Sequence, residues 1–448
     1  MSGTLRFIHA ADLHIGSFLN INGKPPEEIQ ALCSEAVYGG YERICNIAIL
    51  YKVDFILICG DVYDSYLRSV RGNRFFINQC TRLSEINIHV YVIYGNHDAA
   101  NEKQELFDMP INVHILSSDS AEIYEVCKDD EIIAKIVGKS YKLRSEREKI
   151  YENYLMDNDS FNIAMLHTAL ERDNKNYVPC TLEELKAVPN IDYWALGHIH
   201  KTNILSSIKP IIAFPGIPQG RDMGEQGQGG VFYIEVCKKD IIKMEFLPIA
   251  TIIYKRVEII IVEESKIENF SDLMGLILDK TKEVTYGLTK IYNEFEQPKE
   301  AINDEFKGHI LQLVIKGRTE LQDKITHMKE EDYKQFVEDI NEELSTEKYF
   351  MWVDSIIFRT APLMQDFESL KMQNSIFADL DEVISLYREE GEHRVELVKN
   401  WGSIWKKQIY TENMNEDKFD IDEEIIEDII SQARELVIEK LVEALEIM

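Results

Sequence analysis

The sequence is poor in the features that would cross-link it with disulfides or place it in a membrane. Its 448 residues include seven cysteines, and the nearest two, Cys33 and Cys45, are twelve positions apart. This spacing argues against a disulfide framework and against a Cys-x-x-Cys zinc site. No apolar run approaches the roughly 18 residues that cross a bilayer, and the opening MSGTLRFIHAADLH has no signal-peptide pattern. We therefore expect a cytoplasmic protein with no membrane contact.

Positive charge is also scarce. The chain has 49 lysines and arginines against 79 aspartates and glutamates, a net charge of −30, and most of the excess lies after residue 250. Bulk charge of this sign is poorly suited to holding a phosphate backbone. Any binding of nucleic acid must therefore rest on a local basic patch, a bound metal or a basic partner.

The order of apolar runs predicts an α/β protein with a two-sheet core flanked by helices, then a small α+β domain and an acidic helical extension. We place these three domains at residues 1–250, 251–365 and 366–448. In the first, strands are expected at 5–10, 53–59, 88–94, 121–127, 131–137, 161–166, 193–196, 230–236 and 241–247, and helices at 26–51 and 67–84. Later in the chain, strands are expected at 252–262, 309–315 and 349–359, and helices at 269–284, 324–344 and about 425–445.

Five short motifs follow predicted strands, and together they indicate a metal site. They are Asp-Leu-His at 12–14, Gly-Asp-Val-Tyr-Asp at 60–64, Gly-Asn-His-Asp at 95–98, a single histidine at 167 and Gly-His-Ile-His at 197–200. The candidate ligands are Asp12, His14, Asp61, Asn96, His167, His198 and His200. Oxygen and imidazole donors without thiolates suit manganese, iron or zinc. Seven ligands exceed one tetrahedral ion, but they suffice for two divalent ions about 3.5–4 Å apart that share a carboxylate.

The order and spacing of these motifs resemble those of the calcineurin-like metallophosphoesterase superfamily. The segments FIHAADLHIGS, GDVYD, VYVIYGNHD, DYWALGHIH and PGIPQGRDMGE resemble its branch of bacterial DNA-repair exonucleases, which includes SbcD and YhaO proteins. The resemblance covers residues 5 to about 235 and implies a two-sheet β-sandwich core, a capping domain and a helical extension. It also implies a division of ligands: Asp12, His14 and His200 on the first ion, Asn96, His167 and His198 on the second, and Asp61 between them.

His97 is our candidate for stabilising the transition state or protonating the leaving oxygen. A neighbouring carboxylate, Asp98 or Asp64, would keep it protonated, as a general acid requires. Several relatives place a histidine where this chain has Asp64. Alternatively, His97 only hydrogen-bonds within its own loop.

Four arginines are candidates for DNA phosphate contacts. Arg68, Arg71 and Arg74 follow helical spacing after the second motif, and Arg221 stands in a glycine-rich loop. Such pairs would position DNA without reading its bases. The equal alternative is that each pairs with a nearby glutamate at the surface.

The leading functional hypothesis is a manganese-dependent DNA phosphodiesterase, an exonuclease with the 3′-to-5′ polarity that the resemblance implies. On the same grounds we expect a homodimeric nuclease subunit in DNA repair, cytoplasmic and nucleoid-associated when acting on DNA, with an SbcC-like coiled-coil ATPase as partner. The C-terminal helix either docks on that partner or packs on the capping domain. The alternatives are a metallophosphatase or cyclic-nucleotide phosphodiesterase acting on small substrates, and a non-catalytic DNA-repair scaffold.

Overall fold

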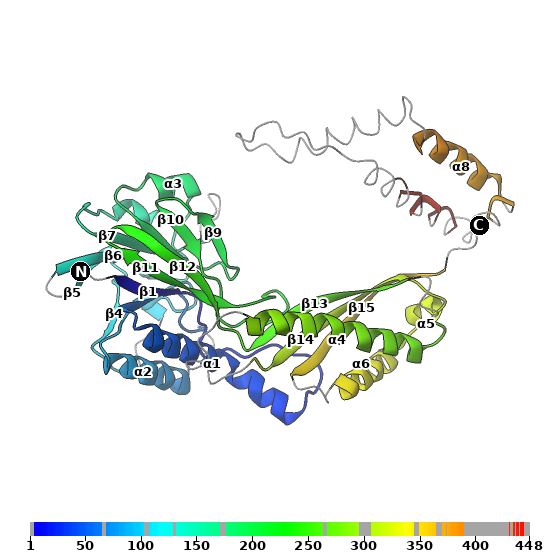
Figure 1. Ribbon diagram of the computed structural model, residues 1–448, viewed down its shortest axis with the longest axis horizontal. Coiled ribbons are helices and arrows are strands. Elements are labelled where there is room, and N and C mark those ends of the chain that lie inside the picture. Colours follow the sequence, from blue (N-terminus) through cyan, green and yellow to red (C-terminus); the bar gives the residue numbers. More distant parts are fainter. Residues whose placement is uncertain are drawn as a thin grey trace. The chain divides into compact units, whose positions relative to one another are not determined.

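The first of two six-stranded sheets contains the N-terminal strand, and three of the five motifs follow its strands (Figure 1). Its strands are β1 (Leu5–Ala10), β2 (Phe55–Cys59), β3 (His89–Ile93), β4 (Val113–Ile115), β11 (Gly230–Cys237) and β12 (Asp240–Pro248), in the order β12-β11-β1-β2-β3-β4. Strands β1 to β4 are parallel, and β11 pairs with β1 antiparallel. The sequence FILIC of β2 is buried throughout, as expected of a strand covered on both faces.

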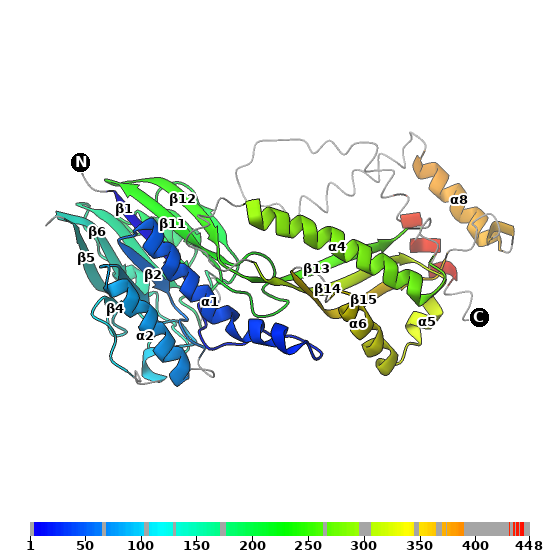
Figure 2. The same ribbon diagram turned by 60° about the horizontal axis from the view of Figure 1, so that its bottom comes forward.

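Helices α1 (Glu27–Tyr51) and α2 (Val70–Ser84) cover one face of this sheet (Figure 2). The alternation of the strands decides which side chains meet the helices: Ile8, Ile56 and Ile58 share a buried cluster with α1 and α2. Their sequence neighbours point to the opposite face. Helix α2 begins where the Ser69 side chain accepts a hydrogen bond from the Gly72 N–H, a typical N-cap.

A second six-stranded sheet packs against the opposite face of the first. Its strands are β5 (Glu122–Lys128), β6 (Glu131–Gly138), β7 (Phe161–His167), β8 (Tyr193–Gly197), β9 (Asn203–Ser206) and β10 (Ile211–Phe214), in the order β5-β6-β7-β8-β10-β9. Phe7 and Phe55 of the first sheet are fully buried with Ile163 of the second. Burying one such side chain contributes about 1.5–3 kcal/mol. The expected two-sheet core flanked by helices is therefore confirmed.

The outer face of the second sheet is covered by helix α3 (Leu182–Ala187) and by loops that include the 3-10 turns η1 (Ala100–Glu102) and η2 (Ile150–Asn153). Ile150 and Tyr151 of η2 share a buried cluster with Leu185 of α3. Trp194 and Leu185 are buried there. A capping box between Thr181 and Glu184 begins α3. This short helix was not expected from the sequence, and neither were the short strands β4, β9 and β10.

A three-stranded sheet follows, made of β13 (Ile252–Ile261), β14 (Gly308–Arg318) and β15 (Phe350–Ala361), with helix α4 (Phe270–Glu294). The single helix expected at 324–344 is wrong, because α5 (Gln322–Thr326) ends and α6 (Glu330–Leu344) begins anew. Three acidic residues in the first turn of α6, at 330–332, favour a helix N-terminus at that point.

The computed structural model describes residues 4–64, 69–102, 107–128, 131–170, 176–262, 267–294, 306–344, 349–363, 370–372, 374–388 and several positions from 430 to 442. Contacts divide the chain into two units. One is Met1–Ile261, Lys266–Lys316 and Lys324–Arg359, and the other is Val262–Ser265, Gly317–Asp323 and Thr360–Met448. The three-domain division at 250 and 365 stays a prediction.

The second unit contains helix α8 (Ser375–Arg388) and part of the C-terminal helix expected from the sequence. Most of residues 425–445 lie outside the described part of the chain, but positions 436–438 and 440–442 are helical. Ile438 is buried there with Leu370 and Phe377. Among the described residues, no helix combines the length and the apolar character that a bilayer crossing needs.

Candidate metal centre

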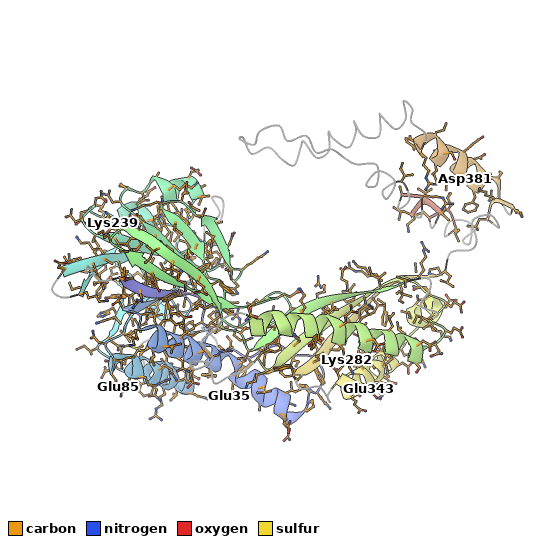
Figure 3. The ribbon with its side chains drawn as sticks, in the orientation of Figure 1. Glu35, Glu85, Lys239, Lys282, Glu343 and Asp381 are labelled. Carbon is orange, nitrogen blue, oxygen red and sulfur yellow. The ribbon has the colours of Figure 1, made fainter. Side chains whose placement is uncertain are left out.

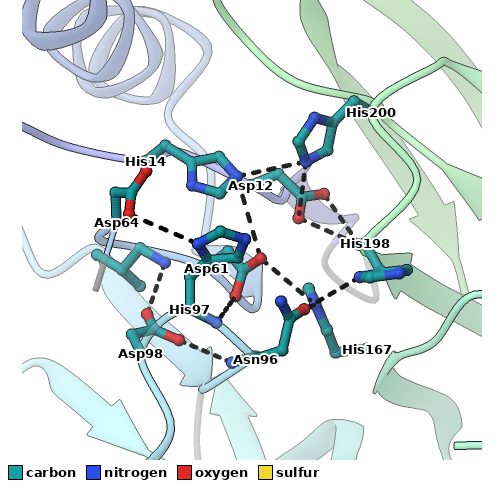
Figure 4. Close-up of polar contacts among 12 residues, drawn as sticks. Asp12, His14, Asp61, Asp64, Asn96, His97, Asp98, His167, His198 and His200 are labelled. Atoms are coloured by element: carbon teal, nitrogen blue, oxygen red, sulfur yellow. Dashed lines mark hydrogen bonds and ion pairs between the residues drawn. The ribbon is translucent and has the colours of Figure 1, made fainter. Parts of the chain in front are cut away.

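Five strands of the two sheets deliver the candidate side chains to one place (Figure 4). The carboxyl ends of β1, β2, β3, β7 and β8 converge there, as parallel strands require. Three buried or half-buried groups of possible metal ligands result: Asp12, His14 and His200; Asp61, His167 and His198; and His14, Asp64 and His97. The seven ligands expected from the sequence are thus brought together, with Asn96 joining the second group.

The first group joins residues that lie far apart in the sequence. Nε2 of His14 lies 3.3 Å from Nε2 of His200, which is 3.9 Å from Oδ1 of Asp12. Asp12 and His14 are fully buried. The three donor atoms lie within 4.8 Å of one another, which is close enough for them to hold one cation.

The second group is built around the Asn96 side chain. Its Oδ1 lies 2.9 Å from Nε2 of His167 and 3.1 Å from Nδ1 of His198. The backbone N–H of His198 donates to both carboxylate oxygens of Asp12. The two groups are therefore connected through the loop after β8.

Asp61 stands between the two groups. Its Oδ2 is 3.5 Å from Nε2 of His167 and 4.0 Å from Nε2 of His14. Its Oδ1 accepts a hydrogen bond from the backbone N–H of His97 at 2.9 Å. One oxygen therefore faces both groups while the other fixes the carboxylate in place.

The protonation of the imidazoles fits bound cations. Nδ1 of His167 donates to the Cys59 carbonyl, and Nδ1 of His200 donates to the Glu225 carboxylate. Because both partners are acceptors, the neutral form of each ring carries its lone pair on Nε2, and that of His167 faces the acceptor oxygens Oδ1 of Asn96 and Oδ2 of Asp61. Such convergence is repulsive unless a cation lies among the donors. Nitrogen and oxygen donors without thiolates fit divalent manganese, iron or zinc.

Unusual backbone angles occur at four of the seven candidate ligands. Asp12, His14, Asp61 and His198 have φ of 53°, 47°, 53° and 98°, in the left-handed region. For residues other than glycine this conformation costs about 1–2 kcal/mol each. Hydrogen bonds from the Asp12 and His14 N–H groups to the carbonyls of Gly60 and Asp61 hold the first two in place. Strain of this kind is retained where a site depends on it.

Glycines of the motifs allow the close packing of the centre, a role that the sequence analysis missed. A Cβ atom on Gly95 would lie 2.3 Å from Oδ1 of Asp61 and 2.7 Å from Nε2 of His167. On Gly197 it would lie 1.8 Å from the Cys59 carbonyl oxygen. The available signal was that a glycine precedes the ligand in three of the motifs.

His97 lies beside the first group, and its side chain is 35% exposed. Its Nδ1 is 3.6 Å from Oδ1 of Asp64, and this contact raises the pKa of His97. Of the two carboxylates considered from the sequence, Asp64 is therefore the one beside the imidazole. Asp98 instead accepts hydrogen bonds from the N–H groups of Val62 and Gly95, which joins the loops after β2 and β3. Burial raises the pKa of Asp98 to about 7.

The four candidate arginines have different environments. Arg71 pairs with Glu35 of α1, labelled in Figure 3, and its guanidinium stacks on Tyr38, as the surface alternative expected. Arg74 lies over the Phe107 ring. Arg221 lies at the metal centre, where its Nη1 is 3.7 Å from Oδ2 of Asp64. The candidate at position 68, Arg68, falls outside the described residues.

Glu225 is a further residue of the centre that the sequence analysis missed. Its Oε1 lies 2.6 Å from Nδ1 of His200 and 2.7 Å from Nη2 of Arg221. Burial opposes its charge, but the hydrogen bonds from His200 and Arg221 prevail and lower the pKa of Glu225 to about 2. The only sequence signal was its place at the end of the PGIPQGRDMGE segment.

Comparison with known proteins agrees with this geometry. Residues 5–202 match the model of the calcineurin-like phosphoesterase family. The chain is 35% identical over 278 residues to the uncharacterized metallophosphoesterase YhaO of Bacillus subtilis, a match that covers 61% of this chain and 67% of that protein.

Two further relatives have names that mention DNA or a nuclease. The DNA double-strand break repair protein Mre11 of Thermoplasma acidophilum is 28% identical over 240 residues, covering 50% of this chain and 60% of the relative. The SbcD component of the nuclease SbcCD of Escherichia coli is 25% identical over 252 residues, covering 46% and 59%. The chain thus spans about three-fifths of these two relatives.

Proposed function

This chain belongs to the calcineurin-like phosphoesterase family, whose members are metal-dependent phosphoester hydrolases, and from that premise we propose that it is a two-metal DNA phosphodiesterase. The observation that carries the proposal is the position of Asp61, one oxygen of which faces both groups of ligands. Two ions that share a carboxylate form the clamp used by phosphodiesterases for in-line displacement.

In this proposal Asp12, His14 and His200 would hold the first ion, Asn96, His167 and His198 would hold the second, and Asp61 would serve both. The ions, when bound, neutralise the phosphate and lower the pKa of a bound water toward neutrality. The protein holds the donors rigidly through the hydrogen bonds of Asp61 and Asp12 and the left-handed backbone of the loops.

His97 supplies the proton in the proposed reaction. Its ring is partly exposed, and its Nδ1 is oriented by Asp64, which favours the charged imidazolium. A positive donor at this position stabilises charge on the phosphate and can protonate the leaving oxygen. In this scheme Asp98 holds the loops after β2 and β3 together, because its oxygens accept hydrogen bonds from the backbone N–H groups of Val62 and Gly95.

DNA is the proposed substrate because two relatives are named for double-strand break repair and for nuclease activity. We propose exonuclease action with 3′-to-5′ polarity on duplex ends, in DNA repair, with manganese as the ion. Arg221 is the arginine at the centre and the best placed for a phosphate contact.

The proposed assembly is a homodimer that works with an SbcC-like coiled-coil ATPase, in the cytoplasm and at the nucleoid. The acidic extension after residue 365 would offer a basic partner a complementary surface. Co-purification of the two chains, with and without residues 366–448, tests this part.

One experiment separates the proposed function from its alternatives. The protein, loaded with manganese, is incubated with linear duplex labelled at either the 3′ or the 5′ end, with a closed circle and with bis-p-nitrophenyl phosphate. His97→Ala is the test variant, and His327→Ala, at an exposed turn, is the matched control.

Shortening of the linear duplex that His97→Ala abolishes and His327→Ala retains would support the nuclease. Cleavage of the small ester alone would indicate a small-substrate phosphoesterase. Retained DNA binding without turnover of any substrate would indicate a scaffold.

A further inference from the structure

Glu225 makes a short, partly buried contact with a ligand of the proposed first metal. Its Oε1 lies 2.6 Å from Nδ1 of His200, and its side chain is only 11% exposed. The two residues are separated by 25 positions and lie on different loops. A contact this close, between side chains from two loops, restricts the rotation of the His200 ring.

The contact also determines which nitrogen of His200 carries the proton. A carboxylate only accepts hydrogen bonds, so the hydrogen of Nδ1 is fixed by Glu225, and the neutral ring that binds a metal carries its lone pair on Nε2. That lone pair faces the first group, 3.3 Å from His14 Nε2 and 3.9 Å from Asp12 Oδ1. A carboxylate in this position makes an imidazole a stronger metal ligand.

Glu225 is itself held by Arg221. The backbone N–H and Nε of Arg221 donate to Oε2, and its Nη2 donates to Oε1. The Arg221 carbonyl accepts hydrogen bonds from the N–H of Asn20 and from the hydroxyl of Tyr254, on β13. The carboxylate is therefore charge-compensated and fixed from two sides before any metal binds.

We infer that Glu225 is a positioning residue that fixes the ring orientation and tautomer of His200 for the first metal, with Arg221 holding Glu225 in place. The inference rests on the proposed two-metal function and deepens it. Glu225 touches neither the proposed substrate nor the proposed ions, and it acts through His200.

The test compares manganese affinity of the full chain in wild type, Glu225→Ala and Glu225→Gln by titration calorimetry. Asp222→Asn is the matched control, because it removes one charge from the same loop and keeps the acceptor for the Gly224 N–H. We expect Glu225→Ala to weaken one of the two manganese sites by about 10- to 100-fold, and Glu225→Gln to weaken it less. The other site and the Asp222→Asn variant should keep wild-type affinity.

A second readout separates positioning from general damage to the fold. Saturating manganese should restore kcat of the Glu225→Gln variant, because only occupancy of the first site is impaired. A defect that persists at saturating manganese overturns the inference, as does unchanged manganese affinity in Glu225→Ala. If Glu225→Ala does not fold, Glu225→Gln decides by the same criteria.

The inference and the proposed function fail in different ways. A wild type that hydrolyses DNA, together with a Glu225→Ala variant of unchanged manganese affinity, overturns the inference alone. A wild type that binds two manganese ions without hydrolysing DNA overturns the proposed function, and the affinities still decide the role of Glu225. A wild type that binds fewer than two ions overturns both.

Discussion

Replacing Gly95 by alanine tests the metal centre at a point where the chain leaves no space for a methyl group. The added Cβ would lie 2.3 Å from Oδ1 of Asp61 and 2.7 Å from Cε1 and Nε2 of His167. Ordinary carbon contacts begin near 3.4 Å. The methyl group must therefore displace the proposed bridging carboxylate, a ligand of the second group, or both.

The magnitude follows from these contacts. Overpacking of a dense region costs about 1–3 kcal/mol. A shift of Asp61 also weakens its hydrogen bond from the His97 N–H, and bonds to charged groups contribute about 1.5–3 kcal/mol. The two costs overlap, so we expect the free energy of unfolding to fall by about 2–4 kcal/mol. Because Asp61 faces both groups, manganese affinity should fall at both sites, by about tenfold or more.

The assay pairs urea unfolding without metal with manganese titration calorimetry. Gly39→Ala is the matched control, because a Cβ on Gly39 meets no atom within 4 Å and the residue lies in α1. Alanine in a helix is more favourable than glycine by about 0.5–1 kcal/mol, so this variant should gain stability and bind manganese like wild type. A Gly95→Ala protein that unfolds like wild type and binds both ions with unchanged affinity would refute the packing argument.

Three further predictions use other parts of the first unit. His198→Ala should reduce bound manganese from about two ions per chain to about one, measured by elemental analysis after gel filtration; full retention would contradict the assignment of the second group. Burial lowers the pKa of His9 to about 3, so below pH 6.5 the unfolded chain binds a proton at His9 that the folded chain does not. The free energy of unfolding should therefore fall by about 1.4 kcal/mol for each unit by which the pH is lowered from 6 to 4. Urea unfolding at pH 7 and 5 should show a smaller loss for His9→Gln, and an equal loss would contradict this. Thr181→Ala removes a capping box and should lower the free energy of unfolding in urea by about 0.5–2 kcal/mol. Manganese affinity should not change, and a change would show that α3 influences the centre.

The convergence of the ligands was predictable because each motif directly follows a strand with a clear apolar run. Parallel strands place their carboxyl ends at one edge, so Asp12, Asp61 and Asn96 had to meet if β1, β2 and β3 were neighbours. The elements that were missed are short. Strands β4, β9 and β10 have three or four residues each, fewer than an alternating pattern needs to be recognised.

The supporting residues could not be predicted, because their roles depend on contacts between distant loops. Glu225 reads as one more acid in an acidic chain until its carboxylate is seen against His200. Helical spacing grouped Arg71 with the candidate DNA contacts, but spacing carries no information about Glu35 on the neighbouring helix α1. The roles of Asp64 and Asp98 were left open for the same reason, and only the contacts of their oxygens distinguish them.

The charge of the centre bears on how an acidic chain could hold a phosphate at all. Five of the described residues discussed there carry carboxyl groups, Asp12, Asp61, Asp64, Asp98 and Glu225, whereas Arg221 is paired with two of them. Imidazoles that bind metals are neutral, so without the ions the carboxyl groups of the centre outnumber the positive charges of Arg221 and His97. We therefore expect the affinity for duplex ends to be higher with manganese than without it, both in the wild type and in His97→Ala. Fluorescence anisotropy at constant ionic strength measures this affinity. Equal affinity with manganese and with a chelator would show that DNA is held elsewhere, and the ions would then serve the chemical step alone.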